Sequence, residues 1–145
     1  MKDSKIIPEN INLFHINILE SDITDSSKPD KLNFDLNVAH NILHNLKDER
    51  VKIGLILNIK SKSSDNEFKA LFNIDFHYKI KDLNHFYEVE EDANIVFSGM
   101  FISTLIGISF STARGIIYQR LAATNMKNII LPVVSPSKIL FSKKN

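Results

Sequence analysis

The sequence predicts an α+β fold: a four-stranded antiparallel sheet of long strands, with one long, kinked helix and a short C-terminal helix packed on one face. Two observations predict it. Apolar and polar residues alternate through most of the first ninety residues, which is the period of strands. Apolar residues then recur at spacings of three and four, which is the period of a helix. The 145 residues fit a single domain, 1–145, which is large enough to bury its own core.

The four strands are expected where the alternation is unbroken, namely over residues 14–19, 32–46, 51–59 and 68–80. In the first of them Phe14, Ile16 and Ile18 are expected on the apolar face, with His15 and Leu19 on the other. Short polar connections between successive strands indicate antiparallel pairing. Strands of about 13 to 16 residues exceed the usual length of 5 to 6. At about 3.3 Å per residue they would reach roughly 45 Å.

The helix is expected to begin near Phe101 and to end near Asn125. Gly107 and Gly115 interrupt it, and each costs about 1 kcal/mol relative to alanine. The two glycines indicate either close packing against another backbone or a kink, and the sequence favours neither. An extended segment, 128–134, follows and leads to the short last helix.

Composition excludes several classes of protein. The net charge of +1 comes from 18 basic and 17 acidic residues, so the chain lacks the basic surface of nucleic-acid-binding domains. The absence of cysteine excludes disulfides, thiolate metal sites and a cysteine nucleophile. The apolar stretch near the start, Ile6-Ile7 before Pro8, is too short for a signal peptide. We therefore expect a cytoplasmic protein. The uncharged stretch 93–113 is long enough to cross a bilayer, but polar residues interrupt it and a buried helix is the preferred interpretation.

A search for catalytic or metal-binding chemistry finds none that stands out. His40 and His44 have the spacing of metal ligands on a helix. They lie in a segment with strand periodicity, however, where four residues span about 13 Å, too far to share a metal. The acidic run at residues 88–92 is interpreted as a solvated loop rather than a cation site. Without a nucleophile–base pair or a phosphate loop, we expect neither an enzyme nor a cofactor nor a metal.

Some apolar residues occupy positions where the strand period calls for polar ones. Four of them lie on the mixed face of their strands: Leu19, Leu43, Ile56 and Leu71. Three more lie in the segment that connects the last strand to the helix: Phe86, Tyr87 and Val89. A contiguous exposed group would mark a partner surface. From the residues alone, packing or an oligomer contact is the preferred interpretation over binding of another polypeptide.

Several segments taken together resemble the SecB family of protein-export chaperones. They are Pro29-Asp30-Lys31-Leu32-Asn33-Phe34-Asp35-Leu36, the strands 51–59 and 68–78, Phe110-Ser111-Thr112-Ala113-Arg114-Gly115-Ile116-Ile117, Ile130-Leu131-Pro132-Val133-Val134-Ser135-Pro136 and Ile139-Leu140-Phe141. No single segment is decisive, but their order and spacing cover roughly residues 10 to 141.

The resemblance implies a dimer of dimers that binds long unfolded segments of precursor proteins in apolar grooves, without ATP, and hands them to SecA. Some relatives instead protect the antitoxin of a toxin–antitoxin pair. Residues of the connecting and crossover segments are expected to bind the client: Phe86, Tyr87, Val89, Ile129, Ile130, Val133 and Val134, with Leu19, Leu43, Ile56 and Leu71 as secondary candidates. Four helix residues are expected in helix packing or a subunit interface: Leu105, Gly107, Arg114 and Gly115.

The expected function is therefore that of a chaperone that holds unfolded polypeptides, with preproteins for the Sec translocase as clients. Familiar export members are markedly acidic, and that charge helps them dock SecA, whereas this chain is near neutral. Two alternatives remain open. One is a dedicated chaperone of an antitoxin. The other is a monomeric carrier of a small molecule or lipid, which would use the apolar face of the sheet as a cup.

Overall fold

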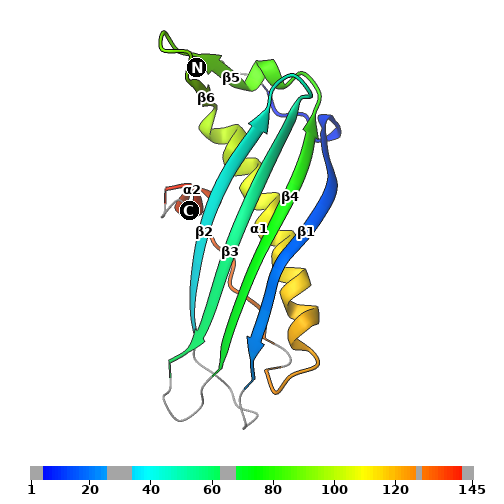
Figure 1. Cartoon of the computed structure of the whole chain (residues 1–145), viewed down its shortest axis with the longest axis vertical. Helices are drawn as coiled ribbons and strands as arrows, with labels where there is room; N and C mark the ends of the chain where they lie inside the picture. Colours follow the sequence, from blue (N-terminus) through cyan, green and yellow to red (C-terminus); the bar gives the residue numbers. More distant parts are fainter. Residues whose placement is uncertain (1–4, 26–33, 63–67, 127–128, 142–145) are drawn as a thin grey trace.

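The computed structural model describes residues 5–25, 34–62, 68–126 and 129–141. A 3₁₀ turn, η1 (Pro8–Asn10), leads into four strands of 12 to 14 residues: β1 (Ile11–Thr24), β2 (Phe34–Asn45), β3 (Arg50–Ser61) and β4 (Lys69–Ile80). They form one antiparallel sheet in the order β1-β4-β3-β2 (Figure 1). The four strands of the sequence analysis are confirmed, each with bounds shifted by a few residues.

One face of the sheet, which we call the helix face, is covered by α1 (Gly99–Leu121) (Figure 1). The helix begins two residues earlier than expected, because the Ser98 hydroxyl caps it by accepting a hydrogen bond from the Phe101 amide at 3.4 Å. It ends before the expected Asn125. By length and composition α1 could cross a membrane, and 44% of its most apolar window is buried within the molecule.

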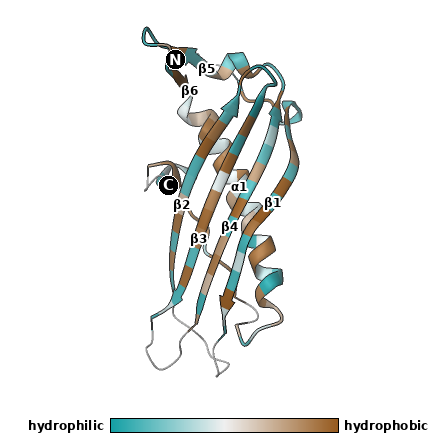
Figure 2. Cartoon of the chain, viewed as in Figure 1, coloured by the Kyte–Doolittle hydropathy of each residue, from teal (hydrophilic) through white to brown (hydrophobic). Residues whose placement is uncertain are grey.

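The core lies between α1 and the two central strands. Alternate residues of these strands point to the helix face and are fully buried: Val51, Ile53, Leu55, Leu57, Ile59, Phe72, Ile74, Phe76, Tyr78 and Ile80. Figure 2 shows the same alternation as hydrophobic and hydrophilic bands along the strands. Each buried apolar side chain stabilises the fold by roughly 1.5–3 kcal/mol.

The pairing of β1 with β4 is irregular in two places. The register shifts between Leu13 and His15 and again between Ile18 and Glu20. In both places β1 carries one more residue than the strand opposite, as in a β-bulge. The side chains of β1 therefore do not keep one alternation along the whole strand.

These shifts correct one expectation. Phe14 and Leu19 are the residues that the pairing skips. Phe14, expected on the same face as Ile16 and Ile18, lies instead on the face opposite α1, where its ring centroid is 6.1 Å from that of His77. We call this face the outer face.

The segment between β4 and α1, to which no helix or strand was assigned from the sequence, contains regular elements. It contains a 3₁₀ turn, η2 (Leu83–Phe86), and a two-stranded hairpin, β5 (Tyr87–Val89) and β6 (Ile95–Phe97). Strands of three residues are too short to show a period in the sequence. The hairpin projects beyond the end of the sheet (Figure 1).

Candidate functional site

After α1 the chain returns along that helix in an extended segment, residues 129–135, which we call the crossover segment (Figure 1). It ends in the short helix α2 (Pro136–Leu140), which packs on α1 and on the edge strand β2. Leu131 and Ile139 are buried and anchor this part of the chain. Ile130, Val133 and Phe141 are left 66%, 83% and 84% exposed. Such exposure of large apolar side chains in succession is typical of a surface that binds a partner.

Two contacts to α1 hold the crossover segment and α2 in place. The Arg114 Nε donates a hydrogen bond to the Leu131 carbonyl at 2.9 Å. Closer to the start of α1, Pro136 packs over Gly107, where a Cβ atom would lie only 3.1 Å from the Pro136 Cγ. Gly107 therefore permits the close approach of the Pro136 ring, and Arg114 holds the backbone of the crossover segment.

An apolar cleft of about 390 Å³ lies beside the end of α2. We call it the β2–β6 cleft. It is lined by residues of β2, β6, α1 and α2: Ile42, His44, Ile95, Val96, Phe97, Gly99, Ile102 and Leu140. The His44 ring meets the Phe97 ring edge-on at 5.4 Å. The exposed Phe141 directly follows Leu140, which lines this cleft, whereas Ile130 and Val133 lie farther back along the crossover segment. Together the cleft and these exposed residues form the candidate groove.

Negative charge borders the candidate groove on one side. The turn of the β5–β6 hairpin carries Glu88, Glu90, Glu91 and Asp92 around the exposed Val89. The Asp92 carboxylate is fixed in the turn because it accepts hydrogen bonds from the Asn94 amide at 3.2 Å and from the Asn94 side chain at 2.7 Å. Carboxylates grouped in this way attract basic groups and repel acidic ones.

The residues expected to bind a client lie in three places. Ile129, Ile130, Val133 and Val134 form the crossover segment, as the resemblance implied, with Ile129 and Val134 partly buried. Whether they bind a client stays a prediction.

A second set lies at the base of the hairpin. Phe86 is only 8% exposed, and its ring stacks on that of Phe101 at 4.6 Å, so it supports the hairpin from the core and is closed to a client. Tyr87 meets Phe97 edge-on at 5.8 Å and thereby supports the wall of the β2–β6 cleft.

The third set lies on the outer face, on the far side of the sheet from the crossover segment. Leu19 and Leu43 are exposed there, and Ile56 and Leu71 are partly buried. The structure therefore does not bring these four residues together with the candidate groove.

The four residues expected in helix packing or a subunit interface lie in different environments. Leu105 is fully buried on the side of α1 that faces the sheet, and its carbonyl accepts a hydrogen bond from the Tyr78 hydroxyl at 3.2 Å. Nothing lies within 4 Å of the position of a Cβ on Gly115, which is exposed. Gly107 and Arg114 make the contacts to α2 and to the crossover segment described above. A subunit interface at any of these residues stays a prediction.

Sequence analysis missed the residues that line the β2–β6 cleft. Ile95, Val96 and Phe97 form an apolar triplet directly after the acidic run, and this triplet was the available signal. His44 was considered only as a metal ligand. Within the described ranges, no group of three or more histidine, aspartate and glutamate side chains could hold a metal ion.

The fold, but not the sequence, has counterparts among known proteins. No family model matches the sequence, and no curated protein matches it. Among solved structures, the Mycobacterium tuberculosis Rv1957 SecB-like chaperone, in complex with a ChAD peptide from the Rv1956 HigA1 antitoxin, superposes with a TM-score of 0.64. The match covers 88% of this chain and 91% of that one, at 10% sequence identity. The fold is SecB-like. A Streptococcus agalactiae protein of unknown function also matches, over 85% of this chain and 97% of that one at 10% identity, with a TM-score of 0.41.

Proposed function

We propose that this protein is a chaperone that holds an extended, unfolded polypeptide in the candidate groove without using a nucleotide. The observation that carries the proposal is the exposure of Ile130, Val133 and Phe141 along the crossover segment and the end of α2, on a SecB-like fold. Anchored apolar side chains bind other apolar side chains at about 25 cal/mol per Å² of buried surface. This attraction depends on area rather than on a particular sequence, as a holding chaperone requires.

The client is proposed to be an unfolded preprotein on its way to the Sec translocase, with SecA as a further partner. An antitoxin is the second candidate client, because the structural neighbour Rv1957 is in complex with a peptide from an antitoxin. The acidic border of the groove supports clients in which basic residues flank apolar ones. A general chaperone would bind many unfolded chains with similar affinity, whereas an antitoxin chaperone would bind one partner far more tightly than the rest.

We further propose a cytoplasmic homo-oligomer, a dimer of dimers, formed through the side of α1 that faces away from the sheet. Met100, Ile108 and Tyr118 are exposed on α1. A wide hollow of about 810 Å³ lies beside Met100 and Ile108, between α1 and the start of α2. Light scattering on the purified protein tests this proposal, since a mass of one chain at micromolar concentration would contradict it.

The carrier alternative receives no support from the packing. It requires an open apolar face of the sheet, but α1 fills that face, and Leu105, Ile106 and Ile117 are buried against it.

The test is a calorimetric titration with a permanently unfolded polypeptide, in the absence of nucleotide. We compare the unaltered protein with the double variant Ile130→Asp, Val133→Asp. The buried charges and lost apolar contacts should weaken binding by about tenfold or more while the variant stays folded.

The matched control is Ile7→Asp, Leu19→Asp, which adds two charges at exposed apolar positions outside the groove. It should bind within about twofold of the unaltered protein. An unchanged affinity in the groove variant, or an equal loss in the control, would overturn the placement of the site.

A further inference from the structure

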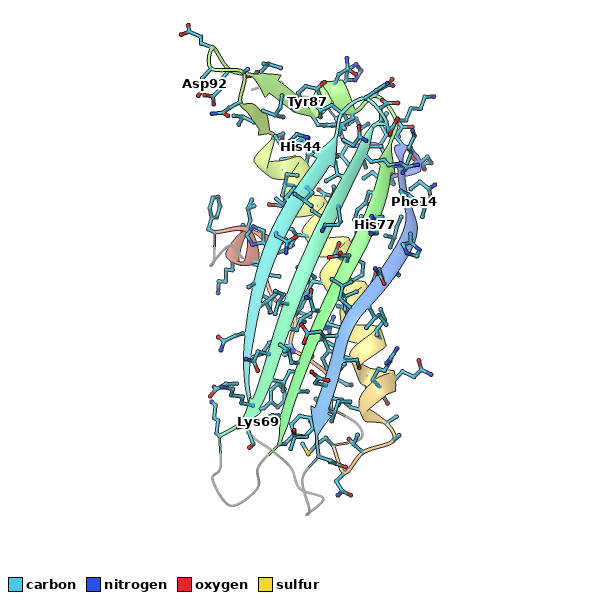
Figure 3. The ribbon with its side chains drawn as sticks, in the orientation of Figure 1. Phe14, His44, Lys69, His77, Tyr87 and Asp92 are labelled. Atoms are coloured by element: carbon cyan, nitrogen blue, oxygen red, sulfur yellow. The ribbon has the colours of Figure 1, made fainter. Side chains whose placement is uncertain are left out.

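All four strands contribute to a compact group of side chains on the outer face, at the end of the sheet near the β2–β3 turn. We call it the outer-face cluster, and it consists of Phe14, Leu43, Arg50, Lys52, Asp75 and His77. The candidate groove does not include it. Figure 3 shows Phe14 and His77 next to each other near one end of β1 and β4, with Lys69 at the other end of β4.

Aromatic rings and a cation meet in this cluster. The Phe14 ring centroid is 6.1 Å from that of His77, and His15 approaches His77 on the same side at 5.4 Å. The Arg50 guanidinium carbon lies 5.2 Å from the centre of the Phe14 ring, within the range of a cation–π interaction. The register shift after Leu13 turns Phe14 toward these residues.

The charge of the cluster is positive. Lys52 Nζ lies 3.4 Å from Asp75 Oδ2, so the Asp75 carboxylate is compensated. Among the described residues, no carboxylate forms an ion pair with Arg50. The pKa of His77 is lowered from 6.5, first by burial, while the attraction of Asp75 is opposed by the charges of His15, Lys52 and Arg50. The guanidinium is therefore available to an anion from outside.

A hollow of about 270 Å³ lies beside the guanidinium, between the exposed side chains of Phe14 and Leu43. Pockets for small molecules and cofactors usually measure ~300–1,000 Å³ and enclose most of the ligand. This hollow is smaller and more open, and it suits one large side chain of a longer chain that continues on either side.

We propose that the outer-face cluster binds an acidic segment of a partner polypeptide. A carboxylate of that segment would pair with Arg50, and a neighbouring large apolar side chain would occupy the hollow between Phe14 and Leu43. Guanidinium–carboxylate pairing of this kind is among the stronger polar contacts that proteins make. This site lies across the sheet from the candidate groove, takes polypeptide of the opposite charge, and does not depend on the proposed chaperone function.

An acidic polypeptide fits this surface better than a nucleic acid does. Asp75 lies among the cations, and Glu20 and Asp22 follow on the same face of β1, opposite Asn73 and Leu71. A phosphate backbone carries a charge at every nucleotide and would pass these carboxylates. A peptide can place a single carboxylate at Arg50 and an uncharged side chain next to it.

The probe is a fluorescein-labelled peptide in which Glu-Phe-Glu is flanked by glycine and serine, and binding is followed by fluorescence polarisation. The comparison peptide has Lys-Phe-Lys in the same frame. The unaltered protein should bind the acidic peptide and not the basic one, more weakly as salt rises. Arg50→Glu should weaken binding by about tenfold or more, and Phe14→Ser by several-fold, through loss of the carboxylate pair and of the apolar contact.

Lys69→Glu is the matched control, because it makes the same change of charge on β4 at the far end of the sheet (Figure 3). It should leave the affinity within about twofold. The Ile130→Asp, Val133→Asp variant should bind the acidic peptide normally, so failure here and failure of the groove are distinguishable.

Four results would overturn the proposal. They are no binding of the acidic peptide up to about 1 mM, equal losses in Arg50→Glu and Lys69→Glu, preference for a twelve-nucleotide single strand over the peptide, and a loss of self-association in Arg50→Glu without peptide. The last result would assign the site to the acidic hairpin of a second copy, residues 88–92.

Discussion

The two sides of α1 use apolar residues in opposite ways. Toward the sheet, Phe101, Leu105 and Ile117 are fully buried, and the side chains of β3 and β4 close over them without leaving an apolar group exposed. Away from the sheet, the crossover segment and α2 touch the helix at a few points, chiefly through Arg114 and Gly107.

The difference follows from how each layer is held. The sheet layer is held by the burial of the same side chains that fill it. The crossover layer is held by a hydrogen bond to a backbone carbonyl, by a glycine contact and by the two buried anchors Leu131 and Ile139. Ile130, Val133 and Phe141 are exposed and take no part in these anchors.

The largest expected change in stability comes from removing one phenylalanine ring from each layer. Phe76→Ala removes a fully buried ring from the sheet layer and should lower the free energy of unfolding by about 3–5 kcal/mol. Phe141→Ala removes the same ring from the crossover layer, where it is exposed, and should change that free energy by less than about 0.5 kcal/mol. Urea denaturation measures both. If the two variants lost similar amounts of unfolding free energy, the two layers would not differ as described.

Tyr78 provides the next test, because its hydroxyl is the polar contact inside the sheet layer. It donates to the Leu105 carbonyl and lies 2.7 Å from the Ser109 hydroxyl. Tyr78→Phe leaves Ser109 buried without this partner and should cost about 1–3 kcal/mol.

The Tyr78 contribution should also depend on pH. Burial raises the pKa of Tyr78 from 10.0 to about 12, and the hydrogen bond with Ser109 opposes part of that rise. Because the folded pKa exceeds the unfolded one, the stability due to Tyr78 is complete below pH 10 and is lost as the pH rises through about 12. The advantage of the unaltered protein over Tyr78→Phe should therefore shrink across this interval. A constant difference in melts at several pH values would show that the hydroxyl is not buried as described.

A smaller effect is expected at the anchor of the crossover segment. Arg114→Ala removes the hydrogen bond to the Leu131 carbonyl and should lower stability by about 1.5 kcal/mol. Arg120→Ala, on the exposed side of the same helix, removes a 3.3 Å contact with the Ser21 hydroxyl and should cost less than about 0.5 kcal/mol. Equal stabilities of the two variants in thermal melts would mean that Arg114 does not anchor the segment.

The smallest expected change in stability concerns the two glycines of α1, Gly107 and Gly115. Gly115→Ala should stabilise the protein by about 0.5–1 kcal/mol, because a methyl group there meets open space and alanine favours the helix. Gly107→Ala should gain less, since the added methyl group would lie 3.1 Å from Pro136. A larger gain at Gly107 than at Gly115 would show that α2 does not pack closely on the helix.

The main sheet and the helix could be predicted because their periods extend over many residues, nine in the case of Val51 to Ile59. The shifts in β1 could not be predicted from the period, which assumes unbroken pairing. Their signal is local: the adjacent apolar pairs Leu13-Phe14 and Ile18-Leu19 stand where the register changes. Strict alternation from Leu13 would turn Ile16 and Ile18 away from α1, and the extra residue at the first shift keeps them on the helix face.

The crossover segment of the candidate groove was named from the resemblance of 130–136 to the SecB family, and its binding of a client stays a prediction. The β2–β6 cleft was missed because it joins Ile42, Phe97 and Leu140, which lie far apart in the sequence and meet only through the packing of the hairpin and α2. The outer-face cluster was missed as well, because it depends on the register shift that places Phe14 on the outer face.

The most direct test of the central claim is hydrogen–deuterium exchange of the unaltered protein with and without a permanently unfolded polypeptide. We expect the bound polypeptide to slow exchange in the crossover segment, α2 and β6, while the central strands, already closed by α1, change little. Slowed exchange confined to the outer face or to the exposed side of α1, with the crossover segment unaffected, would contradict it.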